Sequence, residues 1–203
     1  MTYHLHKGDL PASVDLGPVV AVDSETMGLV TGRDRLCLVQ LSSGDGEAHL
    51  VQIALGQQEA PRLAALMSDP AITKLFHYAR FDVATIGAHL GAWPQPIYCT
   101  KIASKLVRTY TDRHGLKDLC RELLGVDLSK QQQSSDWGAP DLSDEQLRYA
   151  ASDVLYLHAL KARLDAMLAR EGREELARAA FEFLPTRARL DLLGWADVDI
   201  LAH

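Results

Sequence analysis

The segment at residues 19–29 (VVAVDSETMGL) restricts the fold most, because it joins an apolar run directly to two acidic residues. Residues 19–22 are typical of a strand inside a protein core. Asp23 and Glu25 stand at the end of this predicted strand, and residues two apart on a strand point to the same face. Two such carboxylates repel each other, and a divalent cation is the simplest compensation. The segment therefore predicts a core strand with a metal-binding end.

The remaining pattern predicts an α/β fold. The first three strands are expected at residues 19–23, 36–41 and 48–53. The Asp45-Gly46 step between the last two is typical of a hairpin, so an antiparallel meander comes first. Helices and strands then alternate, with helices at 57–67, 79–90 and 101–110 and strands at 72–78 and 96–100. This alternation indicates parallel strands in the same sheet, flanked by helices.

The chain after Gly115 is predicted to be mostly helical. Gly125 suits the C-cap of a helix at residues 116–125. One long amphipathic helix is expected over 142–170, where Ser143 and Gln146 form a capping box. The segment 181–203 is too apolar for a free tail, so it packs back on the domain or contacts another subunit. We expect one domain over residues 1–203.

Composition narrows the class of protein. With 203 residues, 47% of them hydrophobic, the chain can bury one substantial core. Its formal net charge of -6 excludes a protein that coats nucleic acid through charge alone. Three scattered cysteines without metal-ligand spacing favour free thiols in a reducing compartment. No apolar signal region or membrane-length run is present, so we expect a cytoplasmic protein without a membrane partner.

Two more carboxylates complete an acidic set. Asp82 opens a helix directly after a strand, and Asp153 lies four residues after Tyr149, on the same helical face. Taken singly, Asp82 could only favour a helix N-terminus, Asp153 could be solvated and Tyr149 could be a core aromatic. Together with Asp23 and Glu25 they offer the hard oxygen ligands that Mg²⁺ and Mn²⁺ prefer. Two such cations could hold a phosphodiester while Tyr149 orients or deprotonates the attacking water.

Three motifs, VDSET, HYARFD and YAASD, resemble those of DEDD-type 3′–5′ exonucleases whose third motif is Tyr-x-x-x-Asp. The segment SSDWGAPDLSDEQLRYAASDVLYL is similar to the ribonuclease D branch, and RDRLCLVQLS, SKQQQSSDW and LDLLGW are similar to its short, single-domain nanoRNase C (NrnC) group. This resemblance implies a ribonuclease H-like fold and a two-metal mechanism. It also implies 3′–5′ hydrolysis of very short RNA, dinucleotides included, and a homo-oligomer in the form of an octameric ring.

The resemblance assigns roles to five residues. The metal-binding carboxylates would be Asp23, Glu25, Asp82 and Asp153, and Tyr149 would position or deprotonate the water. The second motif departs from the commoner His-Asn-Ala-x-x-Asp pattern, because Tyr78 stands in place of the asparagine. Cys99 likewise stands where many ribonuclease D enzymes have an aspartate. Neither change touches a metal ligand, but both put the transfer of substrate contacts from the longer enzymes in doubt.

Substrate contacts are expected from Thr26, Leu29, His77, Gln133 and Trp137. Leu29 matches a leucine that wedges between the last two bases in related oligoribonucleases, although a core leucine fits the sequence equally well. His77 could contact phosphate or pack under the site. Gln133 could reach phosphate or base edges, and Trp137 could stack on a base or anchor its loop.

A small basic run follows the third predicted helix of the alternating part. It could bind phosphate or a neighbouring subunit, or simply face solvent, and consists of Arg108, Arg113, His114 and Lys117.

Three functions remain open from the sequence. The leading one is a metal-dependent 3′–5′ exoribonuclease that converts short RNA to nucleoside 5′-monophosphates. A 3′–5′ DNA exonuclease of broader specificity would use the same chemistry, and no residue can be assigned to the 2′-hydroxyl. A non-catalytic nucleic-acid-binding protein is the third alternative, and the intact set of carboxylates with Tyr149 argues against it.

Overall fold

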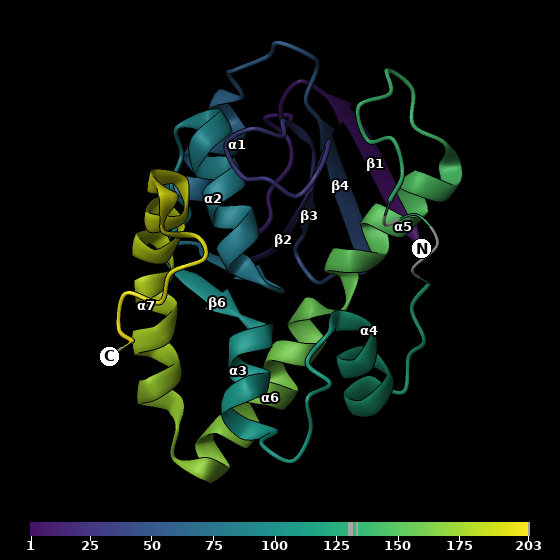
Figure 1. Ribbon diagram of the computed structural model, residues 1–203. Helices are drawn as coiled ribbons and strands as arrows, with labels where there is room; N and C mark the ends of the chain where they lie inside the picture. The colour runs from purple at the N-terminus through teal and green to yellow at the C-terminus, as the bar shows by residue number, and fades with distance from the viewer. Residues whose placement is uncertain (130–131, 133, 203) are drawn as a thin grey trace.

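The computed structural model describes residues 1–129, 132 and 134–202, and in these a mixed sheet of six strands forms the centre of the molecule (Figure 1). The strands are β1 (Thr2–Lys7), β2 (Val19–Thr26), β3 (Leu36–Ser42), β4 (Glu47–Gln52), β5 (Thr73–Phe76) and β6 (Ile97–Cys99). Their order in the sheet is β1-β4-β3-β2-β5-β6. The predicted α/β class with a mixed sheet is confirmed.

The sheet is antiparallel in its middle and parallel on both sides. β2, β3 and β4 form the predicted meander, and β5 and β6 continue parallel to β2. The hairpin between β3 and β4 contains the predicted Asp45-Gly46 step, and Gly46 has a φ of 94°, which suits a residue without a side chain. All seven residues of β3 are buried, so the meander forms the centre of the core.

The edge strand β1 was not predicted. It pairs in parallel with β4 from Thr2 to Lys7, and its sequence TYHLHK is too polar to indicate a strand by itself. Its position depends on partners far along the chain, because Lys7 Nζ donates to Gln52 Oε1 at 2.6 Å and to the Pro140 carbonyl oxygen at 3.0 Å. A strand held by such distant contacts leaves little local signal in its sequence.

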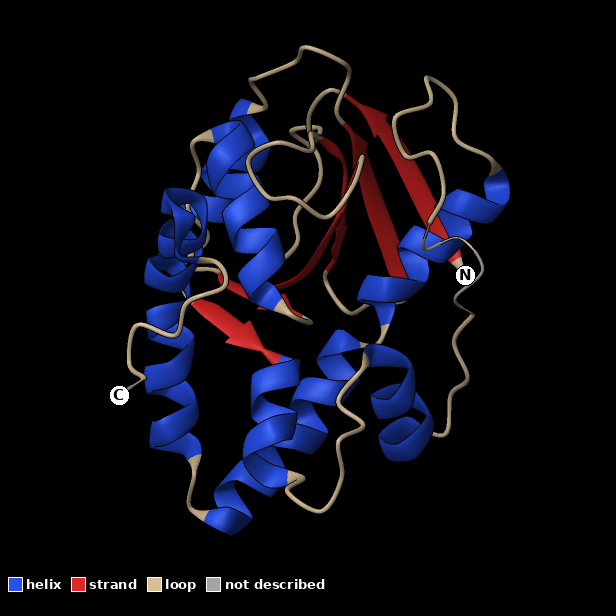
Figure 2. Ribbon diagram, in the orientation of Figure 1, coloured by secondary structure: helices blue, strands red, loops and turns tan. Residues whose placement is uncertain are grey.

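Helices cover both faces of the sheet and extend below it (Figure 2). They are α1 (Pro61–Ser68), α2 (Ala79–Leu90), α3 (Thr100–Val107), α4 (Leu116–Leu119), α5 (Asp144–Leu155), α6 (Leu157–Glu171) and α7 (Glu174–Leu190), with π-helical segments η1 (Cys120–Leu124) and η2 (Asp191–Trp195). The predicted C-cap at Gly125 is confirmed, with a φ of 70°. The capping box of Ser143 and Gln146 at the start of α5 is also confirmed.

The predicted long helix over 142–170 is wrong as a single element. It is divided at Tyr156 into α5, which packs on β2, β3 and β4, and α6, which packs on α3 and η1. No proline or glycine marks the break. The division instead follows from packing, because the two halves lie against different parts of the molecule.

The C-terminal segment only partly packs back on the domain. Asp191 accepts hydrogen bonds from the Arg80 guanidinium, at 2.5 Å between Oδ2 and Nε, and Arg187 donates to the carbonyl oxygens of Trp195 and Val198. Several apolar side chains beyond this point are nevertheless exposed, namely Leu193, Trp195, Val198, Ile200 and Leu201. Among the described residues, no helix combines the length and the apolar character needed to span a membrane.

Candidate active site

The two acidic residues of the opening segment lie inside β2 rather than beyond it, because the strand continues to Thr26. Asp23 and Glu25 therefore share one face of a rigid strand, as predicted, and both are half-buried. The regular pairing with β3 shifts between Glu25 and Thr26. The backbone thus departs from the ladder directly after the second carboxylate.

The helix α5 brings the third carboxylate and the tyrosine to the same place. Carboxylate oxygens of Asp23, Glu25 and Asp153 all lie within 4.8 Å of one another, a group that could hold a metal ion. Tyr149 is one helical turn before Asp153 and lines the same cavity. The predicted convergence of residues far apart in the sequence is therefore present.

Asp82 approaches from the first turn of α2 on the other side of β2. Its Oδ1 accepts a hydrogen bond of 2.6 Å from Ser24 Oγ, and the side chain is buried. The sequence analysis did not assign Ser24 a role, although a lone polar residue between Asp23 and Glu25 was a signal. Asp82 is not a member of the group of three oxygens within 4.8 Å, but Asp23 raises its pKa, so Asp82 lies close to that group.

The acidic group is electrostatically unfavourable without a cation. Burial raises the pKa of Asp23 to about 7 and that of Glu25 to about 10, the latter with additional repulsion from Asp23, Asp153 and Asp82. The pKa values of Asp82 and Asp153 are also raised, mainly by burial and then by Asp23. Clustered carboxylates whose pKa values are raised, with no cation among the described causes of the shifts, fit a divalent metal ion with oxygen ligands.

Tyr149 is a neutral phenol in these surroundings. Burial and the nearby charges of Asp153, Glu25 and Asp23 raise its pKa above the ordinary value of 10.0. The hydroxyl of the metal-free protein therefore keeps its proton at neutral pH and can donate a hydrogen bond. Its ring lies 6.1 Å from that of Trp137, centroid to centroid. The two roles expected for Tyr149, orienting the attacking water and deprotonating it, both stay predictions.

A cavity of about 600 Å³ lies over the carboxylates. Its lining includes four of the five predicted substrate contacts, namely Thr26, Leu29, His77 and Trp137. Gln133 and Lys130 lie outside the described residues. Lys101, Lys117 and Tyr78 also line the cavity. Lys101 was not singled out from the sequence, because a lysine in a helical segment is ordinarily solvated.

The predicted substrate contacts differ in how much of each side chain is exposed. Leu29 is 85% exposed at the cavity, so its interpretation as a core leucine is wrong. Thr26 is nearly buried, and its hydroxyl donates to the Gly28 carbonyl oxygen, so it shapes the turn that presents Leu29. Trp137 is only 2% exposed, which favours the anchoring interpretation over base stacking.

His77 lines the cavity as an uncharged ring. Burial and the nearby Lys101 lower its pKa to about 3. His77 Nδ1 lies 2.9 Å from Thr100 Oγ1, and that hydroxyl in turn donates to the Phe76 carbonyl oxygen. The Thr100 hydroxyl thus links the His77 ring to the backbone at the end of β5. His77 cannot attract phosphate as a cation, but it joins the start of α2 to the start of α3.

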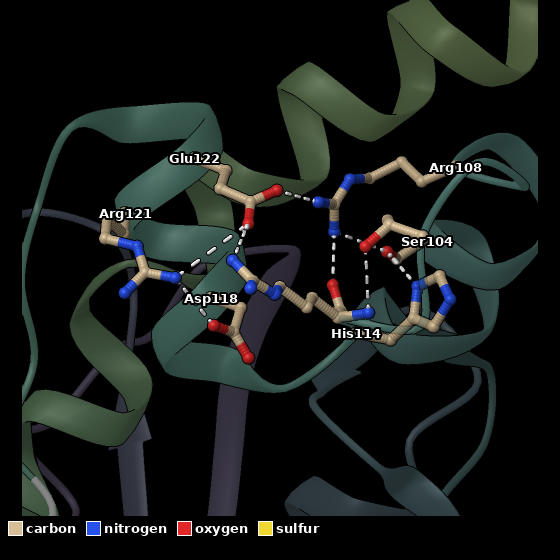
Figure 3. Close-up of polar contacts among 8 residues, drawn as sticks. Ser104, Arg108, His114, Asp118, Arg121 and Glu122 are labelled. Atoms are coloured by element: carbon tan, nitrogen blue, oxygen red, sulfur yellow. Dashed lines mark hydrogen bonds and ion pairs between the residues drawn. The ribbon is translucent and has the colours of Figure 1, made fainter.

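The basic run at the end of α3 is solvated only in part, because Arg113 is exposed whereas Arg108 is not. Arg108 is fully buried, and its guanidinium donates to Glu122, to Ser104 Oγ at 3.3 Å and to the Arg113 carbonyl oxygen at 2.7 Å (Figure 3). His114 Nδ1 lies 2.8 Å from the same Ser104 hydroxyl. This network fixes the connection between α3 and α4, whose residues Gly115, Leu116 and Lys117 line the cavity.

Comparison with known proteins agrees with this geometry. The sequence model of the family described as 3′-5′ exonuclease matches residues 9–169, which include all four carboxylates and Tyr149. Ribonuclease D of Acidiphilium cryptum is 39% identical over 156 residues, or 77% of this chain. The chain spans only 39% of the length of that relative.

Several solved structures match over the full chain. The structure of Brucella melitensis NrnC with bound Mg²⁺ has 57% sequence identity and a TM-score of 0.96, and covers 100% of both chains. Brucella melitensis NrnC bound to pGG has 58% identity and a TM-score of 0.97, covering 100% of this chain and 99% of the other. The likeness therefore includes the C-terminal helices.

The matched region holds the acidic group and most of the mixed sheet, and the chain belongs to the 3′-5′ exonuclease family. Its third motif, Tyr149 to Asp153, is that of the DEDDy type within the ribonuclease D branch. Within that branch the chain is of the NrnC type, since the likeness to NrnC extends over its whole length.

Proposed function

We propose that this protein is a metal-dependent exoribonuclease that hydrolyses short RNA, including dinucleotides, from the 3′ end to nucleoside 5′-monophosphates. The observation that carries the proposal is the convergence of Asp23, Glu25 and Asp153 at the floor of one cavity beside Tyr149. The likeness to an NrnC structure that contains pGG supports the short substrate.

The carboxylates would hold two divalent cations, Mg²⁺ or Mn²⁺. Asp23, Glu25 and Asp153 supply clustered oxygen ligands, and Asp82 is positioned behind them by Ser24. Bound cations supply the positive charge that attracts a phosphodiester, activates water and stabilises the leaving oxygen. The donor set fits this role because hard cations prefer carboxylate oxygens.

The chain's own groups would orient the substrate. Tyr149, as a protonated phenol, donates a hydrogen bond that positions the attacking water or a phosphate oxygen. Leu29 presents an exposed apolar side chain at the cavity, suited to contact with a base. The cavity of about 600 Å³ lies within the range of sites for small ligands, which favours a substrate of very few nucleotides.

We further propose a homo-oligomer, an octameric ring by resemblance to the NrnC group. The exposed apolar side chains in and after η2, among them Leu193, Trp195 and Leu201, support a subunit contact. Sedimentation of the purified protein measures this directly, and a monomer at micromolar concentration would contradict it.

The central test is a length series of 5′-labelled RNA, from the dinucleotide upward, with Mg²⁺ or Mn²⁺ present. We expect hydrolysis from the 3′ end, the highest rate on the shortest RNA, and complete loss with a chelator or with Asp23→Ala. A parallel series of DNA with the same sequences distinguishes the DNA alternative. An uncut dinucleotide beside cleaved long RNA would contradict the short-substrate proposal.

A further inference from the structure

Tyr78 is the residue by which the second motif departs from the commoner pattern, and the proposed chemistry gives it no role. It immediately precedes α2 and has a φ of 66°, the one positive value among the described residues other than glycine. A tyrosine in the left-handed region is strained, and such strain concentrates at functional sites. Its side chain is not buried in compensation, since Tyr78 is 49% exposed.

The strained backbone places the ring at the cavity. Tyr78 lines the same cavity as Asp23, Glu25 and Tyr149. The Lys101 ammonium lies over the Tyr78 ring, 4.0 Å from Nζ to the ring centroid, and Lys101 lines the cavity as well. The wall thus combines an exposed aromatic ring with a cation.

Two adjacent contacts hold this wall of the cavity. His77 is hydrogen-bonded to Thr100. Tyr78 directly follows His77, Lys101 directly follows Thr100, and these two residues form the cation–π pair. The turn between β5 and α2 is thereby joined to the first turn of α3. The ring is held in one orientation before any ligand binds, which lowers the entropy lost on binding.

We propose that Tyr78 is a base-stacking residue that contributes to binding one base of the substrate, with Lys101 holding its ring and facing the substrate backbone. This inference rests on the proposed function and adds to it a recognition element for one base. A flat, preorganised aromatic surface stacks with every base, whereas the asparagine of the commoner pattern cannot do so. Short substrates offer few contacts, so one stacked base contributes a large share of their binding.

The test compares Tyr78→Asn with wild type on a complete dinucleotide and on two analogues, each lacking one base. Asparagine tolerates the left-handed region, so the variant removes the ring without adding strain. We expect unchanged or higher thermal stability, a rise of about tenfold in KM on the complete dinucleotide, equivalent to about 1.4 kcal/mol, and little change in kcat. Tyr78→Phe should behave as wild type.

The analogues identify the stacked base. Wild type should lose about tenfold in kcat/KM on one analogue, and Tyr78→Asn should not distinguish that analogue from the complete dinucleotide. Tyr110→Asn is the matched control, because Tyr110 is also an exposed tyrosine beside a cation, Arg108, but lies outside the cavity. It should leave KM unchanged.

The possible outcomes distinguish a failure of the stacking role from a failure of the proposed nuclease function. If Tyr78→Asn still discriminates against both analogues as strongly as wild type, the stacking role is wrong while the nuclease function stands. If Tyr78→Asn is unstable and its KM is unchanged, Tyr78 is structural. If wild type cleaves no RNA of any length, both proposals fail.

Discussion

At the residue scale, two kinds of buried polar group matter most in this structure. One kind is paired with an opposite charge, and the other is crowded among like charges. Arg108 is buried with a partner of opposite charge, whereas Asp23 and Glu25 are crowded among other carboxylates. The sequence identified the second kind, because acids inside an apolar strand are conspicuous. It missed the burial of Arg108, because an arginine near a helix end is ordinarily solvated and its partner Glu122 lies on another element.

Tyr149→Phe tests the role of the phenol. We expect kcat to fall roughly 10²- to 10⁴-fold with little change in KM, because the lost hydrogen bond acts on the reacting groups and not on the bases. Steady-state kinetics on a dinucleotide measures both constants. Tyr156→Phe is the control, since Tyr156 lies outside the cavity over the carboxylates, and it should keep wild-type rates. A change confined to KM would contradict the prediction.

Arg108→Leu tests the buried network. We expect the free energy of unfolding to fall by about 2 kcal/mol, because Glu122 and the Arg113 carbonyl oxygen lose a charged donor. Urea denaturation measures this change. Arg121→Leu removes an exposed arginine paired with Asp118 and should change stability by about 0.5 kcal/mol or less. Equal effects of the two variants would show that burial of Arg108 is unimportant.

At the scale of the elements, local sequence predicts those whose signals are local. The meander, the capping box of α5 and the C-cap at Gly125 follow from residues within each segment. β1 and the break at Tyr156 depend on what the segments pack against, and hydrophobic period carries no information about that. The turn that exposes Leu29 belongs to the local kind, because it is held by a hydrogen bond within it, from the Thr26 hydroxyl to the Gly28 carbonyl oxygen.

Ser143→Ala tests the start of α5, the helix that carries Tyr149 and Asp153. The Ser143 hydroxyl accepts from the Gln146 backbone N–H at 3.2 Å, so its loss should lower the free energy of unfolding by about 1 kcal/mol. Ser143→Asp keeps an acceptor at this position and should stay close to wild type. Chemical denaturation compares the three proteins, and a stable Ser143→Ala would contradict the role of the cap.

At the scale of the whole molecule, stability without metal should depend on pH through the acidic group. The pKa values of Asp23 and Glu25 are raised on folding, from 3.8 to about 7 and from 4.5 to about 10. The folded state therefore retains protons that the unfolded state releases, and the free energy of unfolding falls as pH rises from about 4 to 7 and above.

Thermal unfolding in a chelator, scanned between pH 5 and 8, measures this dependence. Asp23→Asn should show a shallower fall than wild type, because one of the raised groups is absent. Mg²⁺ should restore stability at neutral pH, by about 2.7 kcal/mol at a hundred times its dissociation constant. A wild-type stability that is independent of both pH and Mg²⁺ would contradict the metal assignment.

The carboxylates that converge on one cavity are far apart in the order of synthesis. Asp23 and Glu25 leave the ribosome early, whereas Asp153 lies on α5, beyond the last strand of the sheet. All six strands of the sheet precede α5 in the chain, so the residue that completes the group comes last. A chain that ended before α5 would lack both Asp153 and Tyr149, so the acidic group and its tyrosine are completed only by the later part of the sequence.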